Sequence, residues 1–203
     1  MKIICIGRNY VDHARELDNP VPEKPVFFLK PDTSLVTQNK PFFYPDFSSN
    51  IHHEVEIVIR INRLGRNIAP RFANRYYDEI TAGIDFTARD LQDRCKEKGL
   101  PWEISKAFDN SAPLGRFVKI NETVDPGNIP IRLDINGKTV QQGNSSQMIF
   151  PFDQIISYIS QFITLKIGDL IFTGTPAGVG PVSIGDRLQA WLNDELLLDF
   201  YVK

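Results

Sequence analysis

Two carboxylates interrupt the apolar, β-branched stretch Ile51-His52-His53-Glu54-Val55-Glu56-Ile57-Val58-Ile59. In a β-strand every second side chain lies on the same face, so Glu54 and Glu56 are predicted to project together while Val55 and Ile57 face the other way. Neighbouring carboxylates on a half-buried surface repel each other and lose hydration, and a bound cation would turn that cost into binding energy. A solvent-facing strand edge with two unused charges is the alternative, and this stretch alone leaves both open.

The composition is typical of one globular domain spanning residues 1–203, with 42% hydrophobic and 24% charged residues. A net charge of -2 gives no general electrostatic reason to bind nucleic acid or an acidic membrane. Cys5 and Cys95 have neither metal-finger nor CxxC spacing, which favours a reducing compartment. The N-terminal apolar run is too short for a signal peptide, and no segment approaches the ~20 apolar residues of a membrane-spanning helix. We therefore expect a soluble, cytoplasmic protein.

Hydrophobic periodicity and turn residues predict a strand-rich α+β fold with few short helices. A helix over residues 88–98 is predicted to begin after Thr87 as N-cap and to stop at Gly99. Asn136-Gly137 predicts a tight hairpin between two strands. The other predicted elements are strands at 2–6, 26–29, 52–61, 80–86, 131–135, 138–141, 170–173 and 188–192, and helices at 9–17 and 155–163.

A third acid, Asp85, falls at the end of a predicted strand, where a rigid backbone can hold a side chain toward a cleft. With Glu54 and Glu56 it would form an all-oxygen site, which suits Mg²⁺ or Mn²⁺ better than Zn²⁺. A helix-capping carboxylate is the competing interpretation of Asp85. His52 and His53 point to opposite faces of a strand, so we interpret them as supporting or structural residues.

Further candidates lie on the predicted helices and in one loop. His13 and Glu16, at i and i+3, can form an oriented pair that activates water, although such a pair also occurs on plain helix surfaces. Arg89 and Gln92 share a helix face that suits a substrate carboxylate or, equally, solvent. The glycine-rich loop at 173–180 lacks the Lys-Ser/Thr of a P-loop, and it is better suited to offering backbone N–H groups and the Thr175 hydroxyl to an anion.

The order of these motifs resembles the fumarylacetoacetate hydrolase family over essentially the whole chain. The matching segments are Gly7-Arg8-Asn9-Tyr10 with His13 and Glu16, Phe28-Leu29-Lys30-Pro31, His53-Glu54-Val55-Glu56, Asp85 to Gln92, Gly99-Leu100-Pro101-Trp102 with Lys106, and Thr173 to Gly180. The branch it looks most like is the acylpyruvase and oxaloacetate decarboxylase group, which has the catalytic domain alone. The resemblance implies a mixed β-sandwich or β-roll of the family's C-terminal-domain type, and a homodimer.

The resemblance also implies roles for the candidate residues. It implies that Glu54, Glu56 and Asp85 bind Mg²⁺ or Mn²⁺. It implies that His13 and Glu16 are a water-activating pair on a segment that orders over substrate. Lys106 would bind substrate and stabilise charge, with Arg89, Gln92 and Thr175 lining the pocket. Gln147 departs from the pattern, because many relatives carry an acid there.

The implied activity is C–C bond cleavage in a small 2-oxo (β-diketo) acid through a metal-stabilised pyruvate enolate. Acylpyruvate hydrolysis and oxaloacetate decarboxylation both fit this description. A tautomerase or isomerase of 2-oxo acids with the same metal site is the first alternative. A non-catalytic β-rich module holding a structural cation is the second. The presence of His13, Glu16 and Lys106 argues against it, because a structural site needs no general base.

Overall fold

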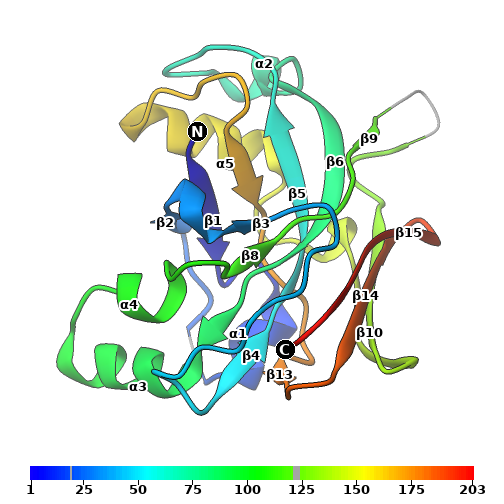
Figure 1. Cartoon of the computed structure of the whole chain (residues 1–203). Helices are drawn as coiled ribbons and strands as arrows, with labels where there is room; N and C mark the ends of the chain where they lie inside the picture. The colour runs from blue at the N-terminus through cyan, green and yellow to red at the C-terminus, as the bar shows by residue number, and fades with distance from the viewer. Residues whose placement is uncertain (19, 121–123) are drawn as a thin grey trace.

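A computed structural model describes residues 1–18, 20–120 and 124–203, and in it a mixed six-stranded sheet forms the centre (Figure 1). β1 runs parallel to β12, and the other neighbours in this sheet are antiparallel. The strands, in sheet order, are β2 (Val26–Lys30), β1 (Ile3–Gly7), β12 (Leu170–Phe172), β5 (Val55–Ile61), β6 (Tyr77–Ile84) and β9 (Val118–Lys119). The strand-rich α+β expectation is confirmed.

The central strands are mostly apolar because both faces of the sheet are covered. Ile4, Ile57 and Ile59 belong to the larger hydrophobic core, whereas Val58 and Phe172 belong to a smaller core on the opposite face. A second sheet contributes its apolar side chains to the larger core and packs against β5 and β6. It contains β11 (Lys138–Asn144), β10 (Pro130–Ile135), β14 (Arg187–Leu192) and β15 (Glu195–Tyr201).

Local turn chemistry accounts for several element boundaries. The predicted hairpin joins β10 to β11 through Asn136 and Gly137, which both have positive φ, at 52° and 78°. One small sheet contains β13 (Gly180–Pro181), β4 (Ile51–His53) and β7 (Thr87–Ala88). Another pairs β3 (Leu35–Val36) with β8 (Ala112–Pro113).

The helices are short and lie around the sheets (Figure 1). They are α1 (Val11–Glu16), α2 (Pro70–Ala73), α3 (Arg89–Lys98), α4 (Glu103–Lys106) and α5 (Phe152–Phe162), with 3-10 turns at Asp32–Ser34 and Ser145–Gln147. The stop of α3 at Gly99, with φ of 63°, is confirmed. The N-cap prediction is wrong: Thr87 pairs with His52 in a strand, and Ala88 precedes the first turn. Within the described ranges no helix is long and apolar enough to cross a membrane.

One strand predicted over residues 52–61 is in fact two, because the chain leaves the ladder at Glu54. β4 pairs with β7 and β13, whereas β5 enters the central sheet. The expected half-buried surface is also absent, since Glu54 and Glu56 are 5% and 1% exposed. Two ionisable side chains are therefore held inside the protein, where they require compensation.

Candidate active site

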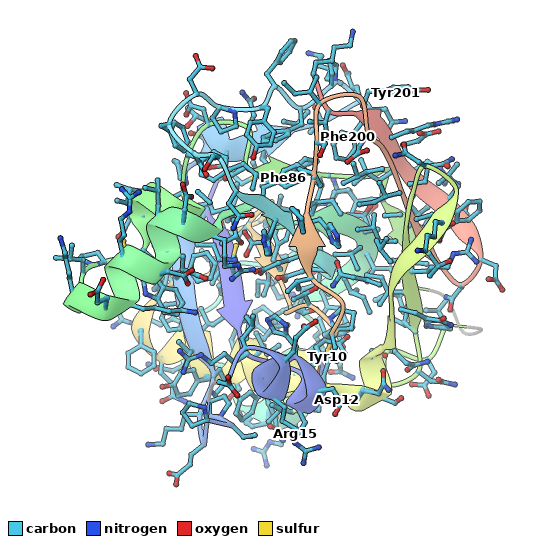
Figure 2. All side chains as sticks on the ribbon, turned by 90° about the horizontal axis from the view of Figure 1, so that it is seen from below. Tyr10, Asp12, Arg15, Phe86, Phe200 and Tyr201 are labelled. Atoms are coloured by element: carbon cyan, nitrogen blue, oxygen red, sulfur yellow. The ribbon has the colours of Figure 1, made fainter. Side chains whose placement is uncertain are left out.

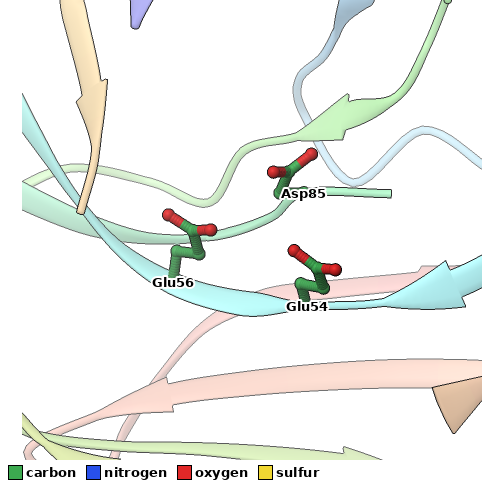
Figure 3. Close-up of side chains that lie close together, drawn as sticks. All are labelled: Glu54, Glu56 and Asp85. Carbon is green, nitrogen blue, oxygen red and sulfur yellow. The ribbon is translucent and has the colours of Figure 1, made fainter. Parts of the chain in front are cut away.

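Three buried carboxylates converge where β5 and β6 meet. Glu54 precedes β5, Glu56 lies within it, and Asp85 directly follows β6. The antiparallel register and a 2.8 Å hydrogen bond from the Asp85 N–H to the Glu54 carbonyl bring the segments together. Each residue offers a carboxylate oxygen within 4.8 Å of the other two. Figure 3 shows the three side chains close together, with their carboxylates projecting to the same side.

Two cationic side chains neutralise part of this charge. The Lys106 ammonium lies 2.8 Å from Glu54 Oε2 and 2.9 Å from Asp85 Oδ2, and Arg89 Nη2 donates to Glu54 Oε1 at 2.7 Å. Burial alone would raise the pKa of Glu54, but the charges of Lys106 and Arg89 outweigh it and hold that pKa well below its usual range. Burial would lower the pKa of Lys106, and the charges of Asp85 and Glu54 raise it instead. Both groups are therefore charged at neutral pH.

Glu56 has a different environment. In the described part of the chain, no ion pair reaches its carboxylate, and Oε2 accepts a single 2.6 Å hydrogen bond from the Gly174 N–H. Burial, and then the charge of Asp85, raise its pKa well above the usual value. Asp85 Oδ1 is buried and receives no hydrogen bond of acceptable geometry from the described residues. A buried carboxylate that has no ion pair with a described residue, within 4.8 Å of two further carboxylates, fits a divalent metal with oxygen ligands.

A second lysine, Lys30, supports the site and was given no role by the sequence analysis. Its ammonium is buried 2.8 Å from Asp85 Oδ1. It also donates to the carbonyls of Phe86, Lys106 and Ser111, and to the Ser111 hydroxyl at 2.9 Å. The signal in the sequence is a lysine that ends the apolar run at 26–29, but its partners are distant along the chain.

Helix α1 presents the His13–Glu16 pair to the same place. His13 is 5% exposed, and its Nδ1 lies 3.3 Å from Glu16 Oε2. The other oxygen of Glu16 accepts from the Gly178 N–H at 3.0 Å. The sequence prediction that the two side chains meet is confirmed, and the buried ring argues against a plain surface pair.

The segment before α1 is anchored by Asn9. Its side-chain amide donates to the carbonyls of Phe150 and Thr173 at 3.0 and 2.8 Å, and accepts from the Phe150 N–H at 2.8 Å. A Cβ on Gly174 would lie 2.6 Å from that of Asn9, and Gly174 has φ of 99°, so glycine is required there. In Figure 2, α1 is seen in the lower part of the view, with Tyr10, Asp12 and Arg15 labelled.

The remaining predicted pocket residues also lie in this region. Arg89 Nη1 donates to Gln92 Oε1 at 2.6 Å, so these two side chains contact each other as well as the cavity. The Thr175 hydroxyl accepts a 2.8 Å hydrogen bond from Gln141, a buried residue of β11 that the sequence analysis missed. Gln141 Oε1 also accepts from the Val55 N–H at 3.0 Å, which ties the 173–180 loop to β5.

The two strand histidines have structural partners, as expected. His53 Nδ1 lies 2.9 Å from Gln141 Oε1, and His52 Nε2 lies 3.0 Å from Asn50 Oδ1. Burial, followed by the charge of Arg89, lowers the pKa of His52 to about 4, so its ring is neutral at pH 7.

All of the predicted site residues except Glu16 line one cavity, of about 420 Å³ including its open mouth. The lining residues are Ile6, Gly7, Arg8, His13, Leu17, Phe28, Glu54, Glu56, Asp85, Arg89, Gln92, Lys96, Trp102, Lys106 and Thr175.

The comparison with known proteins identifies the family. The fumarylacetoacetate (FAA) hydrolase C-terminal family pattern matches residues 2–198, and the chain belongs to this family. The chain is 41% identical over 201 residues to the mitochondrial oxaloacetate tautomerase FAHD1 of Homo sapiens, covering 99% of this chain and 91% of that protein.

Solved structures agree with this assignment. Fumarylpyruvate hydrolase from Pseudomonas aeruginosa, in complex with Mn²⁺ and pyruvate, superposes with a TM-score of 0.94 and 38% identity, covering 100% of this chain and 89% of that one. A 5-carboxymethyl-2-hydroxymuconate delta-isomerase from Mycobacterium smegmatis gives 0.86 and 33%, covering 99% and 78%. Members of the family are enzymes that act on 2-oxo acids and related compounds, and these relatives differ in the reaction that they catalyse.

Proposed function

We propose that this protein is a Mg²⁺- or Mn²⁺-dependent enzyme that cleaves a C–C bond in a small 2-oxo acid, by acylpyruvate hydrolysis, oxaloacetate decarboxylation or both. The main observation behind this proposal is that a buried histidine, paired with a carboxylate, and three converging carboxylates belong to one site. A structural cation needs no general base beside it. The fumarylpyruvate hydrolase that holds Mn²⁺ and pyruvate supports the same class of substrate.

The metal ligands would be Glu54, Glu56 and Asp85. When bound, the ion supplies Lewis-acid stabilisation of the negative charge that develops on the substrate's oxo oxygen. Lys106 contributes a fixed positive charge beside two of these ligands and stabilises the same developing charge. Lys30 holds Asp85 from the opposite side and keeps its carboxylate in place.

His13 has the role of general base in hydrolysis. Glu16 at its Nδ1 fixes the ring so that Nε2 can accept a proton from water, and the Gly178 N–H fixes Glu16 in turn. The activated water adds to the C4 carbonyl of an acylpyruvate, the C3–C4 bond breaks, and C3 takes up a proton to give pyruvate and a carboxylic acid. In decarboxylation, CO₂ leaves oxaloacetate and C3 is protonated, so no attacking water is required.

Tautomerisation of a 2-oxo acid is the second candidate, and the similarity to oxaloacetate tautomerase FAHD1 favours it. It uses the same charges and moves a proton between C3 and the C2 oxygen without breaking a C–C bond. His13 would then transfer the proton directly.

The test is to incubate the metal-loaded protein with acetylpyruvate and with oxaloacetate, and to measure pyruvate together with the keto–enol ratio of oxaloacetate by ultraviolet absorbance. Pyruvate release above the metal-only rate supports C–C cleavage. Fast keto–enol equilibration without pyruvate supports the tautomerase. Neither activity on either substrate would contradict the proposed function.

Three related expectations belong to the same proposal. We propose one catalytic domain over residues 1–203, a cytoplasmic location and a homodimer. The sequence composition and the family resemblance support them.

A further inference from the structure

Two cations in the cavity form no ion pair with a described residue. The Lys30, Arg89 and Lys106 side chains are each paired with Glu54 or Asp85. Arg8 and Lys96 line the same cavity, and neither forms an ion pair or side-chain hydrogen bond with any residue that the structure describes. Both side chains are half-buried, so water hydrates their positive charges only in part.

The position of Lys96 follows from helix α3. Arg89, Gln92 and Lys96 are at i, i+3 and i+7, on one helix face that lines the cavity. Arg89 contacts Glu54, whereas Lys96 is about 10 Å farther along the helix axis, at ~1.5 Å per residue. The backbone of Lys96 is therefore farther along the cavity wall from Glu54 than that of Arg89.

Arg8 is fixed by an unusual backbone. Its φ of 60° is in the left-handed region, which a residue with a Cβ adopts rarely and which often marks a functional constraint. It lies directly after β1, and the next residue, Asn9, is locked to Phe150 and Thr173 by three hydrogen bonds. The fold therefore holds this guanidinium-bearing residue at the cavity wall.

The electrostatics of the two residues agree with this geometry. Burial, and then the charge of Arg89, lower the pKa of Lys96 below its ordinary value; the charge of Arg8 adds to this shift, and the charges of Asp93 and Glu54 oppose it. Positive charges that approach one another in a half-buried cavity attract an anion, and guanidinium and ammonium groups both bind carboxylate by charge-assisted hydrogen bonds.

We propose that Arg8 and Lys96 form a subsite for a second carboxylate, at the end of the substrate remote from its 2-oxo acid group. The enzyme would then select 2-oxo dicarboxylates over 2-oxo acids with an uncharged tail. This inference rests on the proposed function in one respect, namely that the 2-oxo acid group lies at Glu54, Glu56 and Asp85.

Binding of unreactive ligand pairs tests the subsite without relying on turnover. One pair is 2-oxoglutarate and 2-oxopentanoate, and the other is 2-oxoadipate and 2-oxohexanoate. The members of each pair have equal chain length and differ in ending with a carboxylate or a methyl group. Calorimetric titration is carried out on the Mn²⁺-loaded wild type and on Arg8→Gln, Lys96→Gln and Lys98→Gln. Lys98 is exposed on the same helix and is the matched control.

In at least one pair we expect the wild type and Lys98→Gln to bind the dicarboxylate about 10–100-fold more tightly, the usual value of a hydrogen bond to a charged group. Arg8→Gln and Lys96→Gln should each lose most of this preference while binding the methyl-ended ligand as before, which also shows that the variants are folded. Equal affinity within both pairs, or a preference that both variants retain, would overturn the subsite alone. Failure of the wild type to bind any of the four ligands would overturn the proposed function and the subsite with it.

Discussion

Replacing Lys30 with methionine should destabilise the protein strongly, because its ammonium lies among five buried oxygens. These belong to the Asp85 carboxylate, the Ser111 hydroxyl and the carbonyls of Phe86, Lys106 and Ser111. Methionine preserves most of the side-chain volume, so the loss is mainly one of charge and hydrogen bonding. Removing one partner from a buried ion pair costs about 3–5 kcal/mol.

For a chain of this length, about 2–4 °C of melting temperature corresponds to 1 kcal/mol, so Lys30→Met should melt about 6–20 °C below the wild type. Urea unfolding, followed by circular dichroism with EDTA present, measures the free energy of unfolding directly. Lys24→Met is the matched control. Lys24 is exposed and lies six residues before Lys30, so its replacement should change the stability little.

A double-mutant cycle isolates the ion pair from the carbonyl contacts. Asp85→Asn removes the charge that Lys30 faces, so the two substitutions should couple by more than about 1 kcal/mol. If Lys30→Met costs no more than Lys24→Met, or if the double variant shows additive losses, the proposed support of Asp85 by Lys30 is refuted.

Three further predictions concern catalysis and assembly. His13→Ala should reduce acylpyruvate hydrolysis about 10²–10⁴-fold, the usual value of general acid–base catalysis, and should reduce oxaloacetate decarboxylation less, since no water attacks. Steady-state rates on both substrates measure this, and equal losses would exclude a water-specific role. Lys106→Ala should impair both reactions, because it removes a positive charge from the same carboxylates in each case; an unchanged rate on either substrate would contradict that role. Light scattering at micromolar concentration should give twice the chain mass, and a monomer would contradict the dimer expected from the family resemblance.

Local patterns in the sequence predicted much of the fold. Apolar, β-branched runs located the central strands, Asn136-Gly137 located a hairpin, and Gly99 located the end of α3. The break at Glu54 was not predictable from periodicity, because the two halves of the stretch pair with different sheets. The same applies to Thr87, whose pairing with His52 overrides its capping propensity.

The candidate site was predictable only in part. The E-x-E spacing indicates a carboxylate pair, and the family motifs gave the order in which the other residues follow. The supporting residues escaped notice because their partners are far away in the sequence: Lys30 contacts Asp85, and Gln141 contacts both Val55 and Thr175. Arg8 belongs to one of the family motifs, but its positive φ, and its having no ion-pair partner among the described residues, are properties of the fold alone.

The most direct test of the account is calorimetric titration of Mn²⁺ into the wild type, Glu56→Gln and Glu103→Gln. Glu56 is the site carboxylate that forms no ion pair with a described residue. Its amide replacement can still accept from the Gly174 N–H, so the variant should fold. Glu103 is exposed and serves as the control. We expect one Mn²⁺ per chain in the wild type and the control. Loss of metal affinity in Glu56→Gln should exceed about 100-fold, since replacing residues that merely support metal ligands already costs about 10–100-fold. Equal Mn²⁺ affinity in all three proteins would contradict the metal site and the enzyme class built on it.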